Sequence, residues 1–292
     1  KPTRNDTLFL PSLWTVAGRN ARMLPQFASF AQQTGLAEFW DKSGAPDLCA
    51  KAQNADYVCD AIGAGNAPTD VSTLTRATGV AVGPNGIIYL ADFAEHAIRQ
   101  ISAQGVMADF AGSRGIAGFT DGMGSLARFN HPAALAIGTD GNIYVADTNN
   151  HVVRKITPAG AVSTLAGEAG HLGSEDGRAT SARFNYPTSV ALDGLGNVWV
   201  ADFGNHTIRK ISPDGMVSTV AGLAGEAGSA DGPGPVARFN QVHGVAVNLS
   251  GDVYAADFGN HTIRKISPDG IVSTIAGVAG SPGSSDGAGA AA

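Results

Sequence analysis

The stretch VWVADFGNHTIRKI, residues 198–211, returns three more times in this chain with closely similar letters. The other copies begin at residues 88, 143 and 253, so each step is 55 residues. A fixed long period in a sequence indicates a structural unit that is repeated in space. A residue that recurs with the period is expected to do the same structural job in every copy. Candidate functional residues are therefore sought where the pattern breaks.

Each repeat reads as four short strands joined by tight turns. In the third copy, the β-prone runs are residues 190–192, 198–201, 207–211 and 216–222. A Ser-Pro-Asp-Gly turn at 212–215 separates the last two, because proline presets φ and glycine accepts positive φ. The second run is apolar on both faces, as expected for a sheet between neighbours. The third carries charge and is expected to lie nearer solvent.

These features predict an all-β fold, a β-propeller built from four-stranded antiparallel blades. A four-stranded sheet that buries both faces against copies of itself is a propeller blade. A solenoid is the competing repeat fold, but it would show shorter repeats or helices. The chain is expected to hold four complete blades.

The repeats resemble the NHL repeat family of β-propellers. Residues 79–99, 141–156, 196–211 and 244–277 carry the resemblance, which extends over about two thirds of the chain. The resemblance implies six blades in the full protein, and five is the alternative.

A long link between blades, such as residues 167–189, is repeated as well. Each link that follows one of these four blades contains an Asp-Gly pair, at Asp121, Asp176, Asp231 and Asp286. Three links also contain Ala-Arg-Phe-Asn, at residues 127–130, 182–185 and 237–240. We expect an ordered link, in which the phenylalanine fills a crevice between blades while the aspartate and the arginine hold the loop. The arginines are Arg128, Arg183 and Arg238.

The two ends of the chain suggest an incomplete ring. Residues 13–18 resemble a fourth strand without three strands before it, and the chain ends in a link. We expect the missing strands to follow residue 292. The expected organisation is an N-terminal segment with a closing strand (1–18), a link with an insertion (19–78) and four blades ending in an incomplete link (79–292).

The first link departs from the others. Glu38 stands where the later links have arginine, and an insertion over residues 41–75 follows. Residues 26–40 and 47–60 are compatible with short helices. The insertion either decorates the propeller or contributes to a binding face, because insertions in repeat proteins map to loops on one face.

The insertion holds the two cysteines of the chain, Cys49 and Cys59. We expect a disulfide between them, which suits an oxidising compartment; two unrelated thiols are the alternative. No apolar run approaches the roughly 20 residues of a membrane-spanning helix. These features favour an extracellular, cell-surface or periplasmic location. The net charge of -6 argues against a nucleic-acid partner, which requires a basic surface.

Two sets of polar residues recur with the period and are therefore expected to be structural. The histidines lie in the turn between the second and third strands, at His96, His151, His206 and His261. The aspartates open the same turn and are expected to accept hydrogen bonds from its backbone. They are Asp92, Asp147, Asp202 and Asp257.

Other residues break the period near the start of the first strand, which lines the central channel of a propeller. His243 aligns with Thr78, Ala133 and Thr188, and His131 aligns with Tyr186. These six positions are the candidate ligand rim at the mouth of the channel. The alternative interpretation is that the residue types at these positions vary because the rim is exposed to solvent, without a role in binding. One histidine with small neighbours offers neither a metal cage nor an acid–base pair.

The sequence contains no nucleophile elbow, phosphate-binding loop or zinc-hydrolase motif. It therefore favours a non-catalytic secreted or surface-exposed propeller that needs no cofactor. Such a protein would bind a protein or a glycan, or act as a scaffold within a larger assembly. The alternative is a metal-dependent hydrolase or lyase with Ca²⁺ or Zn²⁺ in the central channel, as in lactonases and lyases of similar fold. The sequence indicates no oligomeric state.

Overall fold

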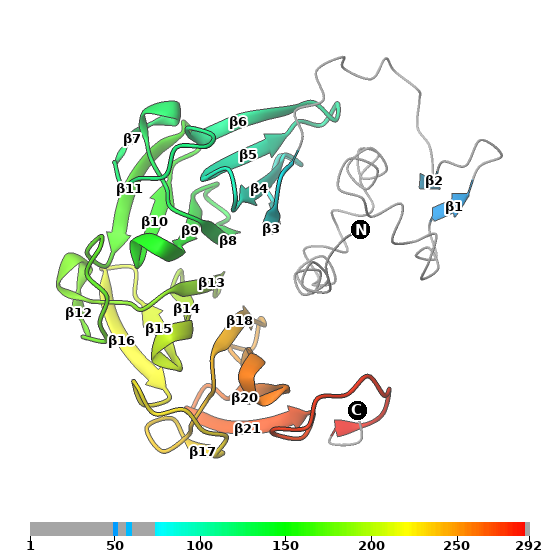
Figure 1. Cartoon of the computed structure of the whole chain (residues 1–292), viewed down its shortest axis with the longest axis vertical. Helices are drawn as coiled ribbons and strands as arrows, with labels where there is room; N and C mark the ends of the chain where they lie inside the picture. The colour runs from blue at the N-terminus through cyan, green and yellow to red at the C-terminus, as the bar shows by residue number, and fades with distance from the viewer. Residues whose placement is uncertain (1–48, 52–56, 60–73, 290–292) are drawn as a thin grey trace.

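The computed structural model describes residues 49–51, 57–59 and 74–289, and its main body is an open arc of four antiparallel sheets (Figure 1). The first blade is β3 (Ala77–Val82), β4 (Ile88–Asp92), β5 (Ala97–Ile101) and β6 (Met107–Gly112). The second is β8 (Pro132–Ile137), β9 (Ile143–Asp147), β10 (Val152–Ile156) and β11 (Ala161–Ala166). The third is β13 (Pro187–Leu192), β14 (Val198–Asp202), β15 (Thr207–Ile211) and β16 (Met216–Ala221). The fourth is β18 (Val242–Val247), β19 (Val253–Asp257), β20 (Thr262–Ile266) and β21 (Ile271–Ala276). The predicted all-β propeller fold is confirmed.

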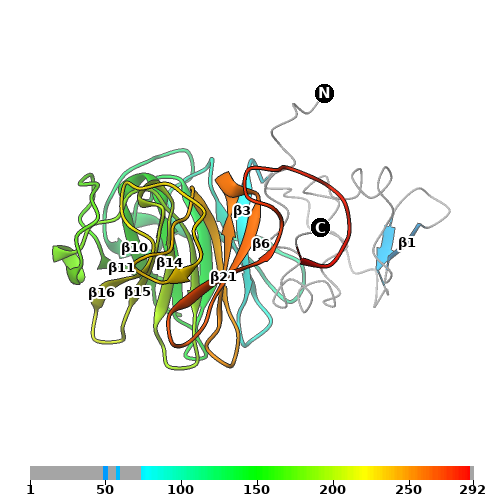
Figure 2. The same cartoon turned by 90° about the horizontal axis from the view of Figure 1, so that it is seen from below.

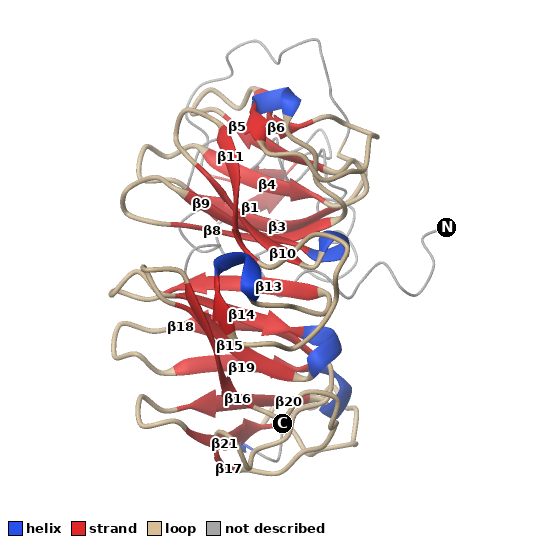
Figure 3. Ribbon diagram, turned by 90° about the vertical axis from the view of Figure 1, so that its left-hand side faces the viewer, coloured by secondary structure: helices blue, strands red, loops and turns tan. Residues whose placement is uncertain are grey.

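The first strand of every blade lies on the concave side of the arc. In Figure 1 the strands β3, β8, β13 and β18 face the central space, and neighbouring first strands contact one another. The fourth strands lie on the outside. Each strand runs between two opposite faces of the arc, where the turns gather (Figures 2 and 3). The start of each first strand therefore lies at a rim of the central space.

The three links between the described blades are ordered, and each adds a fifth strand that the sequence did not reveal. The two-residue strands β7 (Gly122–Met123), β12 (Gly177–Arg178) and β17 (Gly232–Pro233) pair with β11, β16 and β21. Short 3-10 helices follow the first two, η2 (Gly124–Leu126) and η4 (Ala179–Ser181). Each link thus covers the outer edge of the blade that it enters, which protects an otherwise unpaired strand.

The predicted phenylalanine plug is confirmed. Phe129, Phe184 and Phe239 are fully buried. Phe129 lies in one apolar cluster with Ile98 of the first blade and Val145 of the second. The other two phenylalanines join the second blade to the third and the third to the fourth in the same way.

The arginine of the third strand is buried, so the expectation that its charge would place it nearer solvent was wrong. The Arg154 guanidinium lies 5.1 Å from the Phe129 ring centroid. It donates to the carboxylates of Asp147 at 2.9 Å and of Asp121 at 2.6 Å. It also donates to the carbonyls of Arg128 at 2.9 Å and Thr120 at 3.0 Å. The charge is tolerated because two carboxylates and two carbonyls pair with it.

The links that enter the third and fourth blades follow this pattern, with Arg209 and Arg264 in the place of Arg154. The link arginines have a local role instead. Arg128 donates to the carbonyls of Ser125 and Ala127, and Arg183 donates to those of Thr180 and Ala182. Arg238 likewise donates to the carbonyls of its own turn. The partner of the link aspartate is therefore the strand arginine.

The insertion forms a small antiparallel pair in place of the helix considered for residues 47–60. Strands β1 (Cys49–Lys51) and β2 (Tyr57–Cys59) set Cys49 opposite Cys59. Opposite residues of an antiparallel pair have Cα atoms about 4.5–5.5 Å apart, which is within the range that a disulfide spans. The disulfide stays a prediction. The closing strand at 13–18, the helix at 26–40, Glu38 and the missing strands after residue 292 lie outside the described residues.

Replacing Phe184 with alanine should empty the plug site between the second and third blades. A cavity of this kind costs about 3–5 kcal/mol in the free energy of unfolding. Denaturant titration should therefore show a clearly lower midpoint. Leu195→Ala is the matched control, because the Leu195 side chain is 82% exposed. Equal midpoints for the two variants would contradict the plug.

Candidate functional site

One face of the arc combines the histidine turns with the starts of the first strands, and we call it the turn face. The register pairs the first residue of β8 with Asp147 at the end of β9, and Pro187 of β13 with Asp202 in the same way. Each histidine turn therefore lies beside the beginning of a first strand. The turns contain η3 (Thr148–Asn150), η5 (Phe203–Asn205) and η6 (Phe258–Asn260).

The periodic aspartates are buried and fully engaged in the turns. The Asp147 carboxylate accepts hydrogen bonds from the Asn130 backbone N–H at 2.7 Å and the Asn150 amide at 2.8 Å, besides that from Arg154. Asp202 and Asp257 have equivalent partners. Burial raises the pKa of Asp147 and of Asp202 to about 6, against the opposing effect of the arginines. These bonds give the aspartates a structural role.

The periodic histidines join one blade to the next. Nδ1 of His151 accepts the backbone N–H of Tyr186 at 3.2 Å, and Nδ1 of His206 accepts that of Gln241 at 2.9 Å. His96 accepts the N–H of His131 at 3.1 Å in the same way. His261 has the same left-handed backbone and is exposed. Three of the four histidines thus already have a structural hydrogen bond.

Two of the predicted rim residues, Thr188 and Thr78, contribute to contacts between neighbouring first strands. The Thr188 hydroxyl donates to the carbonyl of His243 at 2.9 Å, and the Thr78 hydroxyl lies 3.5 Å from the carbonyl of Pro132. Ala133 is buried. Thr188 and Thr78 thus take part in contacts between strands, and Ala133 is part of the buried interior. Ligand binding by these residues stays a prediction.

His243 belongs to an aromatic cluster at the border of the third and fourth blades. Its ring lies between the rings of Phe203 and Phe258, with centroid distances of 6.0 and 5.9 Å. Burial lowers the pKa of His243, which favours the neutral imidazole. Phe258 is 43% exposed, so the cluster offers an aromatic surface to solvent.

Aromatic rings also occupy the other two borders of the turn face. The His131 ring lies 4.6 Å from Phe93 and 4.4 Å from His96, between centroids. The Tyr186 ring lies 4.5 Å from that of His151 and is 43% exposed. The structure thus places aromatic residues at three successive blade borders. We call this set the aromatic rim: Phe93, His131, Tyr186, Phe203, His243 and Phe258.

Sequence reasoning named three members of the aromatic rim and missed the phenylalanines. The available signal was the residue after each Ala-Asp, which is Phe93, Phe203 and Phe258 in three copies and Thr148 in the other. Because these positions lie inside the repeated turn, a search for breaks in the period does not find them.

The aromatic rim is suited to stacking and offers little acid–base chemistry. Burial lowers the pKa of His131, as it does that of His243. The Arg76 guanidinium lies 4.9 Å from the Phe93 ring centroid, which adds a cation at the first blade. Over residues 74–289 and the short strand pair, no three His, Cys, Asp or Glu side chains gather as they would around a metal ion. Across that same part of the chain, no helix is long and apolar enough to span a membrane.

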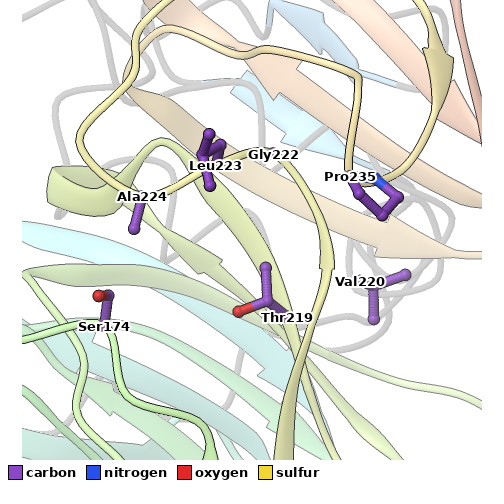
Figure 4. Close-up of a pocket in the computed structure, with 7 residues that line it drawn as sticks. All are labelled: Ser174, Thr219, Val220, Gly222, Leu223, Ala224 and Pro235. Carbon is purple, nitrogen blue, oxygen red and sulfur yellow. The ribbon is translucent and has the colours of Figure 1, made fainter.

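A separate depression lies on the outer side of the third blade. It has a volume of about 350 Å³ and is lined by Ser174, Thr219, Val220, Gly222, Leu223, Ala224 and Pro235 (Figure 4). The Thr219 hydroxyl donates to Asp176 at 3.0 Å, so that hydroxyl is already engaged. No lining residue is charged. The depression therefore offers little to orient a ligand.

Comparison with known proteins identifies the repeat. A family model described as NHL repeat matches residues 129–156, 184–211 and 239–266. The chain is 32% identical over 162 residues to protein SUPPRESSOR OF QUENCHING 1, chloroplastic, of Arabidopsis thaliana, covering 50% of this chain and 15% of that protein. It is 32% identical over 123 residues to NHL repeat-containing protein 3 of Mus musculus, covering 41% of this chain and 32% of that protein. The aligned region thus spans about a third or less of these relatives.

Two solved structures from Bacteroides thetaiotaomicron have a similar fold. One, described as a structural genomics protein of unknown function, is 27% identical with a TM-score of 0.55, over 65% of this chain and 46% of that one. The other, described as an auxiliary nutrient binding protein, is 18% identical with a TM-score of 0.53, over 68% of this chain and 48% of that one. The second likeness concerns the fold alone.

Replacing Thr188 with valine should remove the hydroxyl contact between β13 and β18. The loss of one such hydrogen bond costs about 1 kcal/mol in the free energy of unfolding. Thr78→Val is the matched comparison and should cost less, because its hydroxyl lies 3.5 Å from the acceptor. Chemical denaturation measures both, and equal values would argue against a structural role for Thr188.

Proposed function

Because the chain is an NHL-repeat β-propeller protein, we propose that it is a non-catalytic binding module whose ligand stacks on the aromatic rim. The observation that carries this proposal is the exposure of aromatic rings at successive blade borders of one face. Tyr186, between the second and third blades, keeps 43% of its surface exposed there, and Phe258, in the last blade of the open arc, keeps the same fraction. Rings with this exposure can stack on flat or apolar groups of a ligand.

At the border of the third and fourth blades, the charges near the aromatic rim favour a ligand that is not strongly charged. Asp202 and Asp257 are buried, and Arg209 and Arg264 pair with them. The pKa of His243 is lowered by burial. A neutral glycan or an apolar segment of a protein suits such a surface. The net charge of -6 disfavours a nucleic acid.

Phe258→Ala should weaken binding at the aromatic rim by about tenfold, since stacking contributes about 0.5–1.5 kcal/mol beyond the buried area. The probes are an array of neutral oligosaccharides and a displayed peptide library, screened against the intact protein. Leu249→Ala is the control, because Leu249 is fully exposed in the turn between β18 and β19, on the opposite face.

Equal binding by Phe258→Ala and the parent protein would contradict a role for the aromatic rim. The enzymatic alternative requires a metal in the central channel. A stoichiometric Ca²⁺ or Zn²⁺ in the purified protein would overturn the proposal of a non-catalytic module.

We also propose that the protein works outside the cytoplasm, at the cell surface, in the periplasm or in the extracellular space. The register that sets Cys49 opposite Cys59 supports this, because a disulfide there would persist in an oxidising compartment. Thiol titration of the denatured, unreduced protein should find no free thiol. Two free thiols in protein isolated from its native compartment would argue for a reducing location.

A further inference from the structure

A histidine hydrogen bond crosses each of three blade borders on the turn face. The acceptors are Nδ1 of His96, His151 and His206, and the donors are the backbone N–H groups of His131, Tyr186 and Gln241. Donor and acceptor residues all have left-handed backbone, with φ between 51° and 59°. This conformation is uncommon for such residues, so neighbouring contacts must hold it.

We infer that His96, His151 and His206 are proton-sensitive latches between successive blades. An imidazole nitrogen accepts a hydrogen bond only while it carries no proton, and both ring nitrogens of the cation are donors. Protonation would therefore set two donors against each other at the blade border. The latch would open in mild acid.

The latches hold residues that begin the next blade. Tyr186 and Gln241 directly precede β13 and β18, and His131 directly precedes β8. Opening would therefore release the start of a first strand, next to the aromatic rim. The consequence for a ligand rests on the proposed function, whereas the latch itself does not.

The effect of protonation is simplest to interpret at His151 and His206, because few charged groups act on them. Burial lowers the pKa of His151, whose side chain packs on the Tyr186 ring. Burial also lowers the pKa of His206, and Asp257 of the fourth blade acts in the opposite direction.

His96 is more complex because several charged groups face it. Burial lowers its pKa, while Glu95 and Asp92 oppose that shift. His131 packs against His96, and burial, His96 and Arg76 all lower the pKa of His131. The test therefore uses the other two latches.

The direction of the pH effect follows from the proton balance. An unperturbed histidine, as in the unfolded chain, has a pKa of about 6.5. Burial lowers the pKa of His151 and His206 in the folded protein. Below pH 6.5 the unfolded state binds more protons, so stability falls as the pH falls. Asp147 and Asp202 act in the opposite direction between about pH 6 and 4, because burial raises their pKa. Both aspartates are present in every variant, so they do not alter the comparison.

Asparagine provides a matched replacement that keeps the latch without its titration. Its Oδ1 occupies the place of Nδ1 along the side chain and accepts a hydrogen bond at any pH. Asparagine also tolerates the left-handed backbone. The test protein is His151→Asn combined with His206→Asn. The control is His171→Asn, because His171 is exposed in a link.

We expect the double variant to unfold near the parent's denaturant midpoint at pH 7.5 and to lose less stability between pH 7 and 5. At the acidic end of this range, the equilibrium constant for unfolding should be larger in the parent than in the double variant. The difference is about tenfold for each histidine and each unit by which its pKa is lowered. The free energy of unfolding of the His171→Asn control should fall between pH 7 and 5 as steeply as that of the parent. If the free energy of unfolding falls equally with pH in the parent and in the double variant, the proposed latch is wrong.

Amide hydrogen exchange gives a second reading that needs no variant. In the parent protein, the amides of Tyr186 and Gln241 should lose protection at pH 5.5 relative to pH 7.5, after correction for the intrinsic rate. Unchanged protection would reject the latch even if the double variant did not fold. Neither measurement involves a ligand, so failure here is distinct from failure of the proposed function.

Discussion

The buried guanidinium of the third strand is the interaction on which the rest of the structure depends. Arg154, Arg209 and Arg264 have no exposed surface. Taking a charge out of water costs several kcal/mol unless it is well paired, and removal of one partner leaves that cost uncompensated. Each of these arginines has a strand aspartate and a link aspartate as partners. One side chain thereby joins a blade to the link that enters it.

This pairing explains why a long link is ordered. Asp121, for example, binds Arg154 and also accepts hydrogen bonds from the backbone and hydroxyl of Thr164. The link is therefore held along the outer edge of the blade. The same link places Phe129 between the first and second blades, against the Arg154 guanidinium. The next first strand then begins at a defined place on the turn face, where the aromatic rim forms.

The repeat strongly constrains where function can lie. Residues that recur are occupied by hydrogen bonds within a turn or across a blade border, as the Asp147 and His151 contacts show. Aromatic side chains at the same turns are less constrained, because their outer surfaces face solvent. The candidate site therefore combines repeated positions, such as Phe203, with irregular ones, such as His243. A search restricted to breaks in the period finds only part of it.

By itself, the sequence determined the propeller, the four successive strands of a repeat and the burial of Phe184, because these follow from local periodicity and apolar character. The start of the first strand differs, since β13 begins at Pro187, ahead of the apolar run at 190–192. Only the tertiary structure decided that Arg209 is buried, that the link adds a strand and that aromatic rings from different blades meet. The physical reason is distance along the chain. The partners of Arg209 include Asp176, and those of His243 include Phe203. Contacts between residues so far apart depend on how blades stack, which local pattern does not encode.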